Sequence, residues 1–349
     1  MISGERGDIY IGGAEVHWHP SAMKSGLVYV TDSEPGIARV KRGKGFGYIG
    51  PNGETITLEC ELARIRSLAV PPAYRQVWIC AASNGHIQAT GLDAANRKQY
   101  RYHPEWTDYR REAKFEKLAE FGGKLPRLRR KVELALANAK RDQIFSKEVA
   151  IASLVRLLDH TAMRIGGRSK SSQGATTLML RNITYGNGIL KLRYTAKGGK
   201  KVQSSVNDRR LQKVMEKIHE LPGKRLFQYI GADGLIHPLD SGDVNNWLKQ
   251  TSGMDDISAK MFRTWHGSVA ALQAVRAAKV PTIKLACEAA SSVLCNTPAI
   301  ARKSYIHPKI FDVLKQEDIP RFLRDLPKVS ARGLNADERR LIALLDDGT

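Results

Sequence analysis

Residues 295–308 carry the most informative pattern of the chain, Cys295-Asn-Thr-Pro-Ala-Ile-Ala-Arg-Lys-Ser-Tyr-Ile-His-Pro308. This pattern predicts a short basic helix that ends at Tyr305. A tyrosine hydroxyl is a poor nucleophile at neutral pH, because its ordinary pKa is about 10. It becomes a useful one where cations surround it and the atom it attacks belongs to a phosphate. Tyr305 is therefore a candidate nucleophile if the rest of the chain brings cations to it.

The composition indicates a globular protein with an anionic partner. Of 349 residues, 42% are hydrophobic and 26% charged, which is ordinary for a folded chain, and the length favours two domains. The 56 Lys and Arg residues against 35 Asp and Glu residues give a formal net charge of +21. This excess favours nucleic acid as the partner, with a membrane surface as a weaker alternative. A basic protein without such a partner is the remaining interpretation.

The sequence gives no signal for a membrane span, for export or for a metal site. No apolar run is long enough for a transmembrane helix, and no lipidation motif is present. The N-terminus lacks the blocks of a signal peptide. His17 and His19 have no third ligand nearby. The cysteines form no CxxC pair, which predicts reduced thiols in an intracellular protein; they are Cys60, Cys80, Cys287 and Cys295.

The first third of the chain predicts β-structure with two hairpins. Residues 47–49 and 55–58 flank a Gly-Pro-Asn-Gly turn, and residues 77–80 and 86–90 flank Asn84-Gly85. Asn-Gly between strand-like runs is the strongest short-range hairpin signal. Basic and aromatic side chains mixed on this sheet suit contact with phosphates, sugars or base edges. The alternative is a hydrophobic sheet whose arginines face solvent.

From about residue 107 the pattern becomes helical. Helices are expected at residues 108–120 and 125–140, and Gly122-Gly123 between them is a candidate hinge. Ser146 is expected to cap a helix that runs to Arg164. Further helices are expected at 211–218, after Ser241, after Ser258, which can act as a cap, and at 336–345.

A three-stranded β meander interrupts the helices, with strands expected at 176–180, 189–194 and 201–206. The predicted fold class is therefore α+β. A small β-rich N-terminal lobe, residues 1–106, would precede a larger, mainly α-helical domain, residues 107–349.

Three cations in recognisable settings are candidates to act with the tyrosine. Arg164 precedes Ile-Gly-Gly at the end of an apolar helix, where its planar fork can hold two phosphate oxygens. Lys197 lies in a hairpin tip with two glycines, and Arg263 shares a helix face with Lys260. Taken singly, Arg164 and Lys197 are more simply interpreted as solvated surface residues. The segment around Arg263 is the more specific signal.

Several segments together resemble type IB DNA topoisomerases of the bacterial, poxvirus-like kind. In the predicted helical domain they are 157–164 (LLDHTAMR), 197–199 (KGG), 262–267 (FRTWHG), 296–298 (NTP) and 303–305 (KSY). In the β-rich lobe they are 84–91 (NGHIQATG) and 97–104 (RKQYRYHP). The resemblance runs from about residue 64 to residue 308, in the order expected of the family.

This resemblance implies the fold shared by tyrosine recombinases and type IB topoisomerases, and a role for each matched residue. Tyr305 would attack a DNA phosphodiester, form a 3′-phosphotyrosyl bond and free a 5′-hydroxyl. Arg164 and Arg263 would hold the non-bridging oxygens, and Lys197 would protonate the leaving oxygen. Asn296 matches a position that is His or Asn in the family and would donate a hydrogen bond to a phosphate oxygen. Rotation of the cut end would relax supercoils of either sign without ATP or metal.

The resemblance also implies double-stranded DNA as the partner, no cofactor, and a monomer in the cytoplasm on the bacterial nucleoid. A C-shaped clamp would bind the duplex mostly through phosphates. The residues expected to contact DNA are Arg64, Arg97, Lys98, Tyr100, Tyr102, Arg168, Lys170, Lys260, His266 and Lys303. One departure is the segment 166–174, which is about one helical turn shorter than the family's usual loop. Its basic residues replace acidic ones, so contacts beside the cleavage site and any site preference stay open.

Two other interpretations stay open from the sequence. A tyrosine recombinase shares the chemistry and the catalytic-domain fold. Such enzymes typically have a histidine three residues before the second arginine, where this chain has Lys260, and their core-binding domain is helical rather than β-rich. A non-catalytic DNA-binding protein fits the net charge but leaves the five candidate catalytic residues unexplained.

Overall fold

The computed structural model describes residues 9–11, 14–16, 26–137, 139, 144–167 and 172–346, the first two ranges by their backbone alone. The chain divides into two compact units, Met1–Lys114 and Phe115–Thr349, which are described separately. The boundary predicted after residue 106 lies slightly earlier, within helix α3 (Pro104–Glu116). No helix among the described residues is long and apolar enough to cross a membrane.

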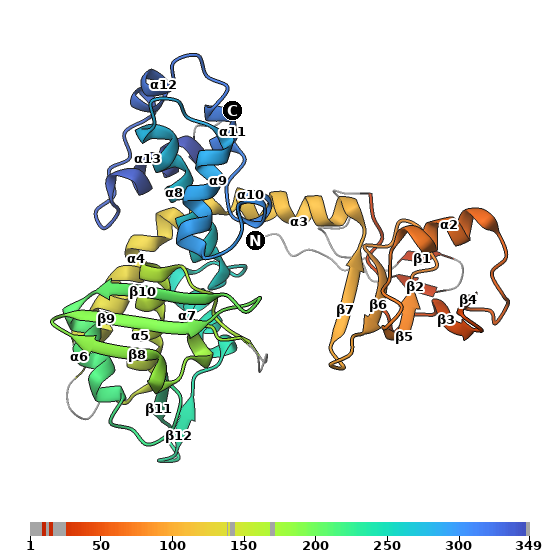
Figure 1. Cartoon of the computed structure of the whole chain (residues 1–349), viewed down its shortest axis with the longest axis horizontal. Coiled ribbons are helices and arrows are strands. Elements are labelled where there is room, and N and C mark those ends of the chain that lie inside the picture. The colour runs from red at the N-terminus through yellow and green to blue at the C-terminus, as the bar shows by residue number, and fades with distance from the viewer. Residues whose placement is uncertain are drawn as a thin grey trace. The chain divides into compact units, whose positions relative to one another are not determined.

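The first unit is built on a five-stranded antiparallel sheet with the order β4-β3-β5-β6-β7 (Figure 1). The strands are β3 (Ile37–Arg42), β4 (Gly45–Ile49), β5 (Arg75–Ile79), β6 (Ile87–Leu92) and β7 (Lys98–Tyr102). Helix α2 (Glu59–Ser67) connects β4 to β5. Because alternate residues of a strand share a face, Val77 and Ile79 both pack in one cluster with Ile65 of α2. A separate pair joins β1 (Ile9–Ile11) to β2 (Ala14–Val16).

One of the two predicted hairpins is confirmed. β5 and β6 flank Asn84-Gly85 and pair antiparallel, with Ile79 opposite Ala89. The other prediction is wrong, because β4 pairs with β3 and residues 55–58 form no strand beyond a single bridge from Thr55 to Ile49. The Leu58 carbonyl already accepts a hydrogen bond from Leu62 N at 3.0 Å. Leu58 therefore already belongs to the start of α2, and the residues left before it are too few for a strand.

The second unit is mainly helical (Figure 1). Its helices are α4 (Leu118–Ala137), α5 (Lys147–Thr161), α6 (Arg209–Ile218), α7 (Ser241–Ser252), α8 (Lys260–Ala277), α9 (Ile283–Leu294), α10 (Pro298–Ser304), α11 (Lys309–Val313), α12 (Ile319–Asp325) and α13 (Ala336–Asp346). One large hydrophobic core joins them. Within it, Phe121 of α4 packs edge-to-face against Phe262 and Trp265 of α8. The predicted α+β class, with a β-rich first unit and a helical body, is confirmed.

Of three expectations about helix ends, the structure confirms one and corrects two. Ser146 caps α5 as predicted, accepting a hydrogen bond from Val149 N. However, α5 ends at Thr161 and not at Arg164, because Ala162 adopts the left-handed conformation with φ 48°. The cap of α8 is Ala259 and not Ser258. The side chain of Asn245 satisfies that helix end from another helix, since its Oδ1 accepts a hydrogen bond from Ala259 N at 3.0 Å.

The prediction of a hinge at Gly122-Gly123 is also wrong. Gly122 and Gly123 both lie inside α4, and the helix break comes at Lys117 between α3 and α4. Gly122 is buried, and a Cβ atom there would lie 2.4 Å from Cη2 of Trp265. Gly122 therefore serves close packing, not bending.

The three-stranded meander is confirmed, with the order β10-β9-β8. Its strands are β8 (Ile183–Gly186), β9 (Ile189–Thr195) and β10 (Lys201–Asn207), and a smaller pair joins β11 (Gln228–Ile230) to β12 (Ile236–Pro238). The strand predicted at 176–180 is wrong, because two 3-10 turns, Ala175–Thr177 and Leu180–Asn182, occupy that region. Side chains there bond the local backbone: Thr177 Oγ1 accepts from Gly174 N, and Asn182 Oδ1 from Met179 N. Such local bonds compete with a sheet ladder.

Candidate active site

Arg263 is the most deeply buried of the candidate catalytic residues. It lies one turn into α8 with only 2% of its surface exposed. Its Nη1 donates to the Ala162 carbonyl and its Nη2 to the Leu294 carbonyl, the latter at 3.0 Å. These carbonyls belong to the C-terminal ends of α5 and α9, and helix ends leave such oxygens without intrahelical partners. Two helix ends thus fix the guanidinium, while its Nε is buried without a hydrogen-bond partner in the described structure.

Tyr305 follows α10 and is buried, with 8% of its surface exposed. Its ring centroid lies 4.8 Å from Cζ of Arg263. Ser268 of α8 holds its backbone: the Ser268 hydroxyl donates to the Tyr305 carbonyl at 3.2 Å and accepts from His307 N at 3.0 Å. A Cβ atom at Gly267 would lie 2.9 Å from the Tyr305 carbonyl oxygen. The glycine after the Arg-Thr-Trp-His run therefore allows the tyrosine backbone to approach α8.

The surrounding cations change the acidity of this tyrosine. Burial alone would raise the pKa of Tyr305, but the charge of Arg263 and hydrogen bonding to it, together with the charges of Lys260 and Arg164, lower it below its ordinary value. Burial in turn lowers the pKa of Arg263. The structure thus places Arg263 against the Tyr305 ring, and the charges of Arg164 and Lys260 act on the same hydroxyl.

Arg164 lies three residues beyond the end of α5 and is half-buried. Its carbonyl accepts a hydrogen bond from Ala175 N at 2.8 Å, which ties the segment to the following 3-10 turn. Gly174 is needed at this contact, because a Cβ atom there would lie 2.6 Å from the Arg164 carbonyl oxygen. Local packing therefore fixes the backbone of Arg164, while its charge acts on Tyr305 and Arg263.

Asn296 directly follows the left-handed residue Cys295, which ends α9. Both side-chain atoms of Asn296, Oδ1 and Nδ2, are buried without a hydrogen-bond partner among the described residues. A buried polar group without a partner carries a desolvation cost of about 1–3 kcal/mol. Together with Nε of Arg263, Asn296 thus offers unused hydrogen-bonding capacity that a bound anion can take up.

Lys197 stands apart from the other four. It lies at the exposed tip of the β9–β10 hairpin, where Gly198 and Gly199 have φ values of 82° and 75°. In the described structure Lys197 makes no hydrogen bond or ion pair with any of the other four candidate catalytic residues. Instead Lys200, which sequence reasoning did not single out, donates from Nζ to the Asn296 carbonyl at 3.5 Å.

Tyr194 is a second residue that sequence reasoning missed. It lies on β9, three positions before Lys197, and is half-buried. Burial raises its pKa to about 12, although the charges of Arg263 and Arg164 act in the opposite direction. Its hydroxyl therefore stays protonated beside the arginines. The only signal in the sequence was its position on the strand that leads to the hairpin tip.

Of the five predicted DNA-binding residues of the first unit, three have ion-pair partners and four are exposed. Arg64 donates to Glu61, to Gln88 Oε1 and to the Cys80 carbonyl, so it ties α2 to the sheet. The charged partners of Arg97 and Lys98 are Asp93 and Asp32. Tyr100 and Tyr102 of β7 stack with centroids 5.8 Å apart and are 43% and 45% exposed.

In the second unit, Lys260 and Lys303 are exposed at the start of α8 and near the end of α10. His266 instead lies 3.1 Å from Asp159, measured from Nε2 to Oδ1. Arg168 and Lys170 lie outside the described residues. No group of three or more His, Cys, Asp or Glu side chains within the described ranges is placed to hold a metal ion.

Comparison with known proteins adds a family to this geometry. Residues 45–93 match the family model of the bacterial DNA topoisomerase IB N-terminal domain, and residues 104–319 match that of the eukaryotic DNA topoisomerase I catalytic core. The chain is 27% identical over 291 residues to DNA topoisomerase 1B of Acanthamoeba polyphaga mimivirus, covering 78% of this chain and 85% of that protein.

Two solved structures are similar over about half of their own length. Both show the XerH site-specific recombinase and are 14% identical to this chain. The post-cleavage complex with palindromic difH substrate covers 51% of this chain and 47% of its own at a TM-score of 0.35. The pre-cleavage complex with difH substrate covers 54% and 52% at a TM-score of 0.34.

Proposed function

The chain belongs to the type IB DNA topoisomerase family, and from this premise we propose that it relaxes positive and negative supercoils by transient cleavage of one DNA strand. The Tyr305 hydroxyl loses its proton to solvent, and its phenolate oxygen attacks a backbone phosphorus. A bond forms between that oxygen and phosphorus, and the bond from phosphorus to the 5′-oxygen breaks. The products are a 3′-phosphotyrosyl linkage and a free 5′-hydroxyl. The cut end rotates, and the reverse reaction reseals the strand.

One observation carries this proposal: the guanidinium of Arg263 lies 4.8 Å from the centroid of the Tyr305 ring, and its buried Nε has no hydrogen-bond partner among the described residues. The fixed carbonyl contacts of Arg263 orient it before DNA binds. A phosphate beside the tyrosine would satisfy this donor and Nδ2 of Asn296. Preorganised donors of this kind stabilise charge that develops in a transition state. Arg164 would add a second cation to the non-bridging oxygens.

The leaving 5′-oxygen needs a proton, and we assign this role to Lys197. The proposal rests on its place in the hairpin that also brings Lys200 to Asn296. The two positive-φ glycines make that tip adaptable. Bound DNA would bring the ammonium to the leaving oxygen.

Double-stranded DNA is the proposed partner of a monomer that acts in the cytoplasm on nucleoid DNA. Among the predicted contact residues, the exposed Tyr100, Tyr102, Lys260 and Lys303 are the best placed to reach DNA. Arg64 and His266 hold internal partners, which favours a supporting role for them. The phosphotyrosyl linkage conserves the bond energy of the phosphodiester. Resealing therefore needs no ATP, and protein cations stand in for a metal at the phosphate.

Relaxation of supercoiled plasmid tests this function. With EDTA present and ATP absent, the wild-type protein should relax both positively and negatively supercoiled DNA, and Tyr305→Phe should relax neither. A wild-type protein that leaves both substrates supercoiled, or a Tyr305→Phe variant that relaxes them, would overturn the proposal.

A further inference from the structure

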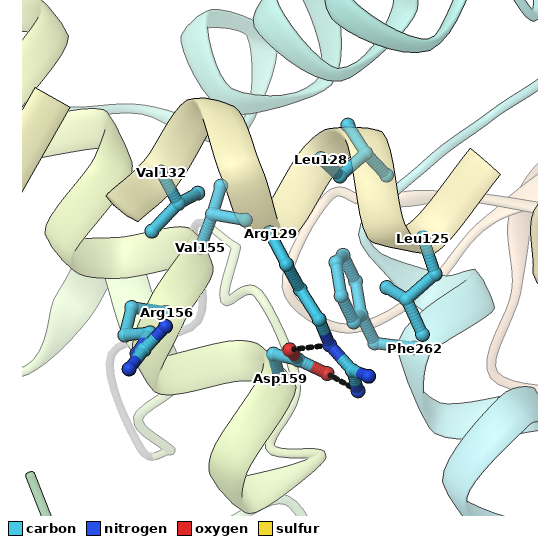
Figure 2. Close-up of a pocket in the computed structure, with 8 residues that line it drawn as sticks. All are labelled: Leu125, Leu128, Arg129, Val132, Val155, Arg156, Asp159 and Phe262. Atoms are coloured by element: carbon cyan, nitrogen blue, oxygen red, sulfur yellow. Dashed lines mark hydrogen bonds and ion pairs between the residues drawn. The ribbon is translucent and has the colours of Figure 1, made fainter. Parts of the chain in front are cut away.

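Arg129 of α4 uses all five of its N–H donors inside the protein. Its Nε donates to Asp159 Oδ2 at 2.7 Å, and its Nη2 donates to Asp159 Oδ1 at 3.0 Å. Nη2 also donates to Glu338 Oε1 at 2.7 Å, while Nη1 donates to Glu338 Oε2 at 2.9 Å and to the Gly333 carbonyl at 2.8 Å. Figure 2 shows the guanidinium reaching from α4 to both carboxylate oxygens of Asp159 on α5.

The two carboxylates also hold α8. Asp159 Oδ1 lies 3.1 Å from His266 Nε2, and Glu338 Oε1 accepts a hydrogen bond from Trp265 Nε1 at 3.1 Å. Trp265 and His266 follow Arg263 by two and three positions. Residues three apart on a helix share a face, so these bonds fix the rotation of α8 within one turn of Arg263.

The same network holds the other side of Arg263. Asp159 lies in the last turn of α5, and three residues later the Ala162 carbonyl accepts the hydrogen bond from Arg263 Nη1. Both partners of that bond are therefore anchored to Arg129, one through α5 and one through α8. Burial raises the pKa of Asp159, but its bonds to His266 and Arg129 outweigh this and hold the pKa well below its usual range. Asp159 therefore stays ionised.

Glu338 brings the C-terminal helix into this network. It lies in the first turn of α13 and is 1% exposed. Its Oε2 also accepts from Asn335 N, and Asn335 Oδ1 accepts from Glu338 N, each at 2.9 Å, so Glu338 is fixed at the helix start. The match to the catalytic-core family model ends at residue 319, before α13 begins.

We propose that Arg129 and Glu338 are positioning residues for the strand transfer, and that α13 is needed to orient Arg263 although it contributes no catalytic residue. This inference rests on the proposed function. The ionic network sets the distance between α5 and α8. Arg263 binds phosphate productively only if α8, which carries it, and the Ala162 carbonyl at the end of α5, to which it donates, both stay in position. A misplacement of about 1 Å can lower a reaction rate on the order of 100-fold.

Glu338→Gln in the full chain is the first test. The amide keeps the shape of the side chain, but its N–H₂ group would face donors of Arg129 or Asn335. Single-turnover cleavage at saturating protein should slow on the order of 10- to 100-fold, with unchanged DNA affinity. Arg129→Lys is the second variant, because it keeps the charge but loses the planar fork, and it should show a similar loss.

Asp208→Asn is the matched control. Asp208 is also a buried carboxylate in an ionic network, bonded to Arg156, His160 and Leu211 N, and within the described structure no bond joins it to α8. It should lower the melting temperature while the cleavage rate stays at the wild-type value. An equal slowing of cleavage in Asp208→Asn and Glu338→Gln would overturn the inference.

A double-mutant cycle separates positioning from general loss of structure. In the Arg263→Lys background, which already lacks the oriented fork, adding Glu338→Gln should not slow cleavage further. In the Lys197→Ala background, adding Glu338→Gln should slow cleavage by the same factor as it does in the wild type. Equal slowing in both backgrounds, or wild-type cleavage by Glu338→Gln alone, would overturn the inference and leave the proposed function intact. A wild-type protein that forms no covalent complex with DNA would instead overturn the proposed function, and this inference with it.

Discussion

The acidity of Tyr305 results from two opposing effects at a single residue. Burial favours the neutral phenol, whereas Arg263, Lys260 and Arg164 favour the phenolate, and the cations prevail. Tyr194, on which the charges of Arg263 and Arg164 also act, shows the other outcome, because burial raises its pKa to about 12. Two tyrosines near the same arginines thus have pKa values shifted in opposite directions. Tyr305 is the one suited to attack, and Tyr194 to donate a hydrogen bond.

The titration of Tyr305 should therefore report its cations. We expect its pKa in the free protein to lie below the ordinary value of about 10, and to rise in Lys260→Ala because a positive charge is lost. The reactive phenolate fraction then falls at any given pH below that midpoint. Carbon-13 NMR of labelled tyrosine ring carbons measures this, with the signal assigned by its loss in Tyr305→Phe. Lys315→Ala, two residues beyond the end of α11 and paired with Asp312, should leave the Tyr305 midpoint unchanged. A midpoint above about 10 in the wild type would contradict this account.

At the scale of the element, the β9–β10 hairpin carries two lysines with different roles, Lys197 and Lys200, three positions apart. Lys200 donates to the Asn296 carbonyl, while Lys197 stays at the exposed tip. The glycines beside Lys197 adopt positive φ values that other residues rarely tolerate. The hairpin is therefore anchored to the site by Lys200, just before β10 begins, and left adaptable at Lys197, where the proton is to be delivered.

The role of Lys197 can be tested by changing the leaving group. Lys197→Ala should slow cleavage of ordinary DNA about 100- to 10,000-fold, the usual range for a lost general acid. The rate should return toward the wild-type value when sulfur replaces the bridging 5′-oxygen, because a thiolate leaves without a proton. Lys201→Ala, an exposed residue at the start of β10, is the control. An equal defect on both substrates would rule out proton donation.

The adjacent glycines of α4 give a matched pair for packing. Gly122→Ala places a Cβ atom 2.4 Å from Trp265, so it should lower the free energy of unfolding by about 1–3 kcal/mol. Gly123 is exposed and a Cβ atom there meets nothing within 4 Å. Gly123→Ala should therefore raise stability by up to about 1 kcal/mol through helix propensity. Denaturant unfolding measures both, and equal effects of the two substitutions would refute this packing role.

Across the whole molecule, the sequence predicted what lies in short segments and missed what depends on distant ones. The Arg263 segment, the cap at Ser146 and the Asn84-Gly85 hairpin each have their signal within a few residues. The glycine pair was misread because the partner of Gly122 is Trp265, far along the chain. The hydrogen bond from Arg129 to Glu338 joins residues 209 positions apart, and no local sequence pattern predicts it. The strand expected at 176–180 failed because side-chain bonds to the local backbone were not foreseen.

The net charge of +21 makes DNA binding a property of the whole chain. We expect the affinity to fall steeply with salt, on the order of 1,000-fold between 50 and 200 mM if about six phosphates are contacted. Lys303→Ala should reduce the slope of log affinity against log salt by about one, and Lys315→Ala should leave it unchanged. Fluorescence anisotropy of a labelled duplex measures these slopes. A salt-independent affinity would contradict the phosphate-dominated binding.

The chemical identity of the protein–DNA linkage tests the central claim most directly. Supercoiled plasmid is mixed with the protein, the reaction is stopped with detergent, and the adduct is digested with protease and nuclease for mass spectrometry. The account predicts a nucleotide joined through its 3′-phosphate to the peptide that contains Tyr305, a free 5′-hydroxyl on the cut strand, and no adduct with Tyr305→Phe. An adduct on another residue, a 5′-phosphate linkage, or an adduct that persists in Tyr305→Phe would contradict it.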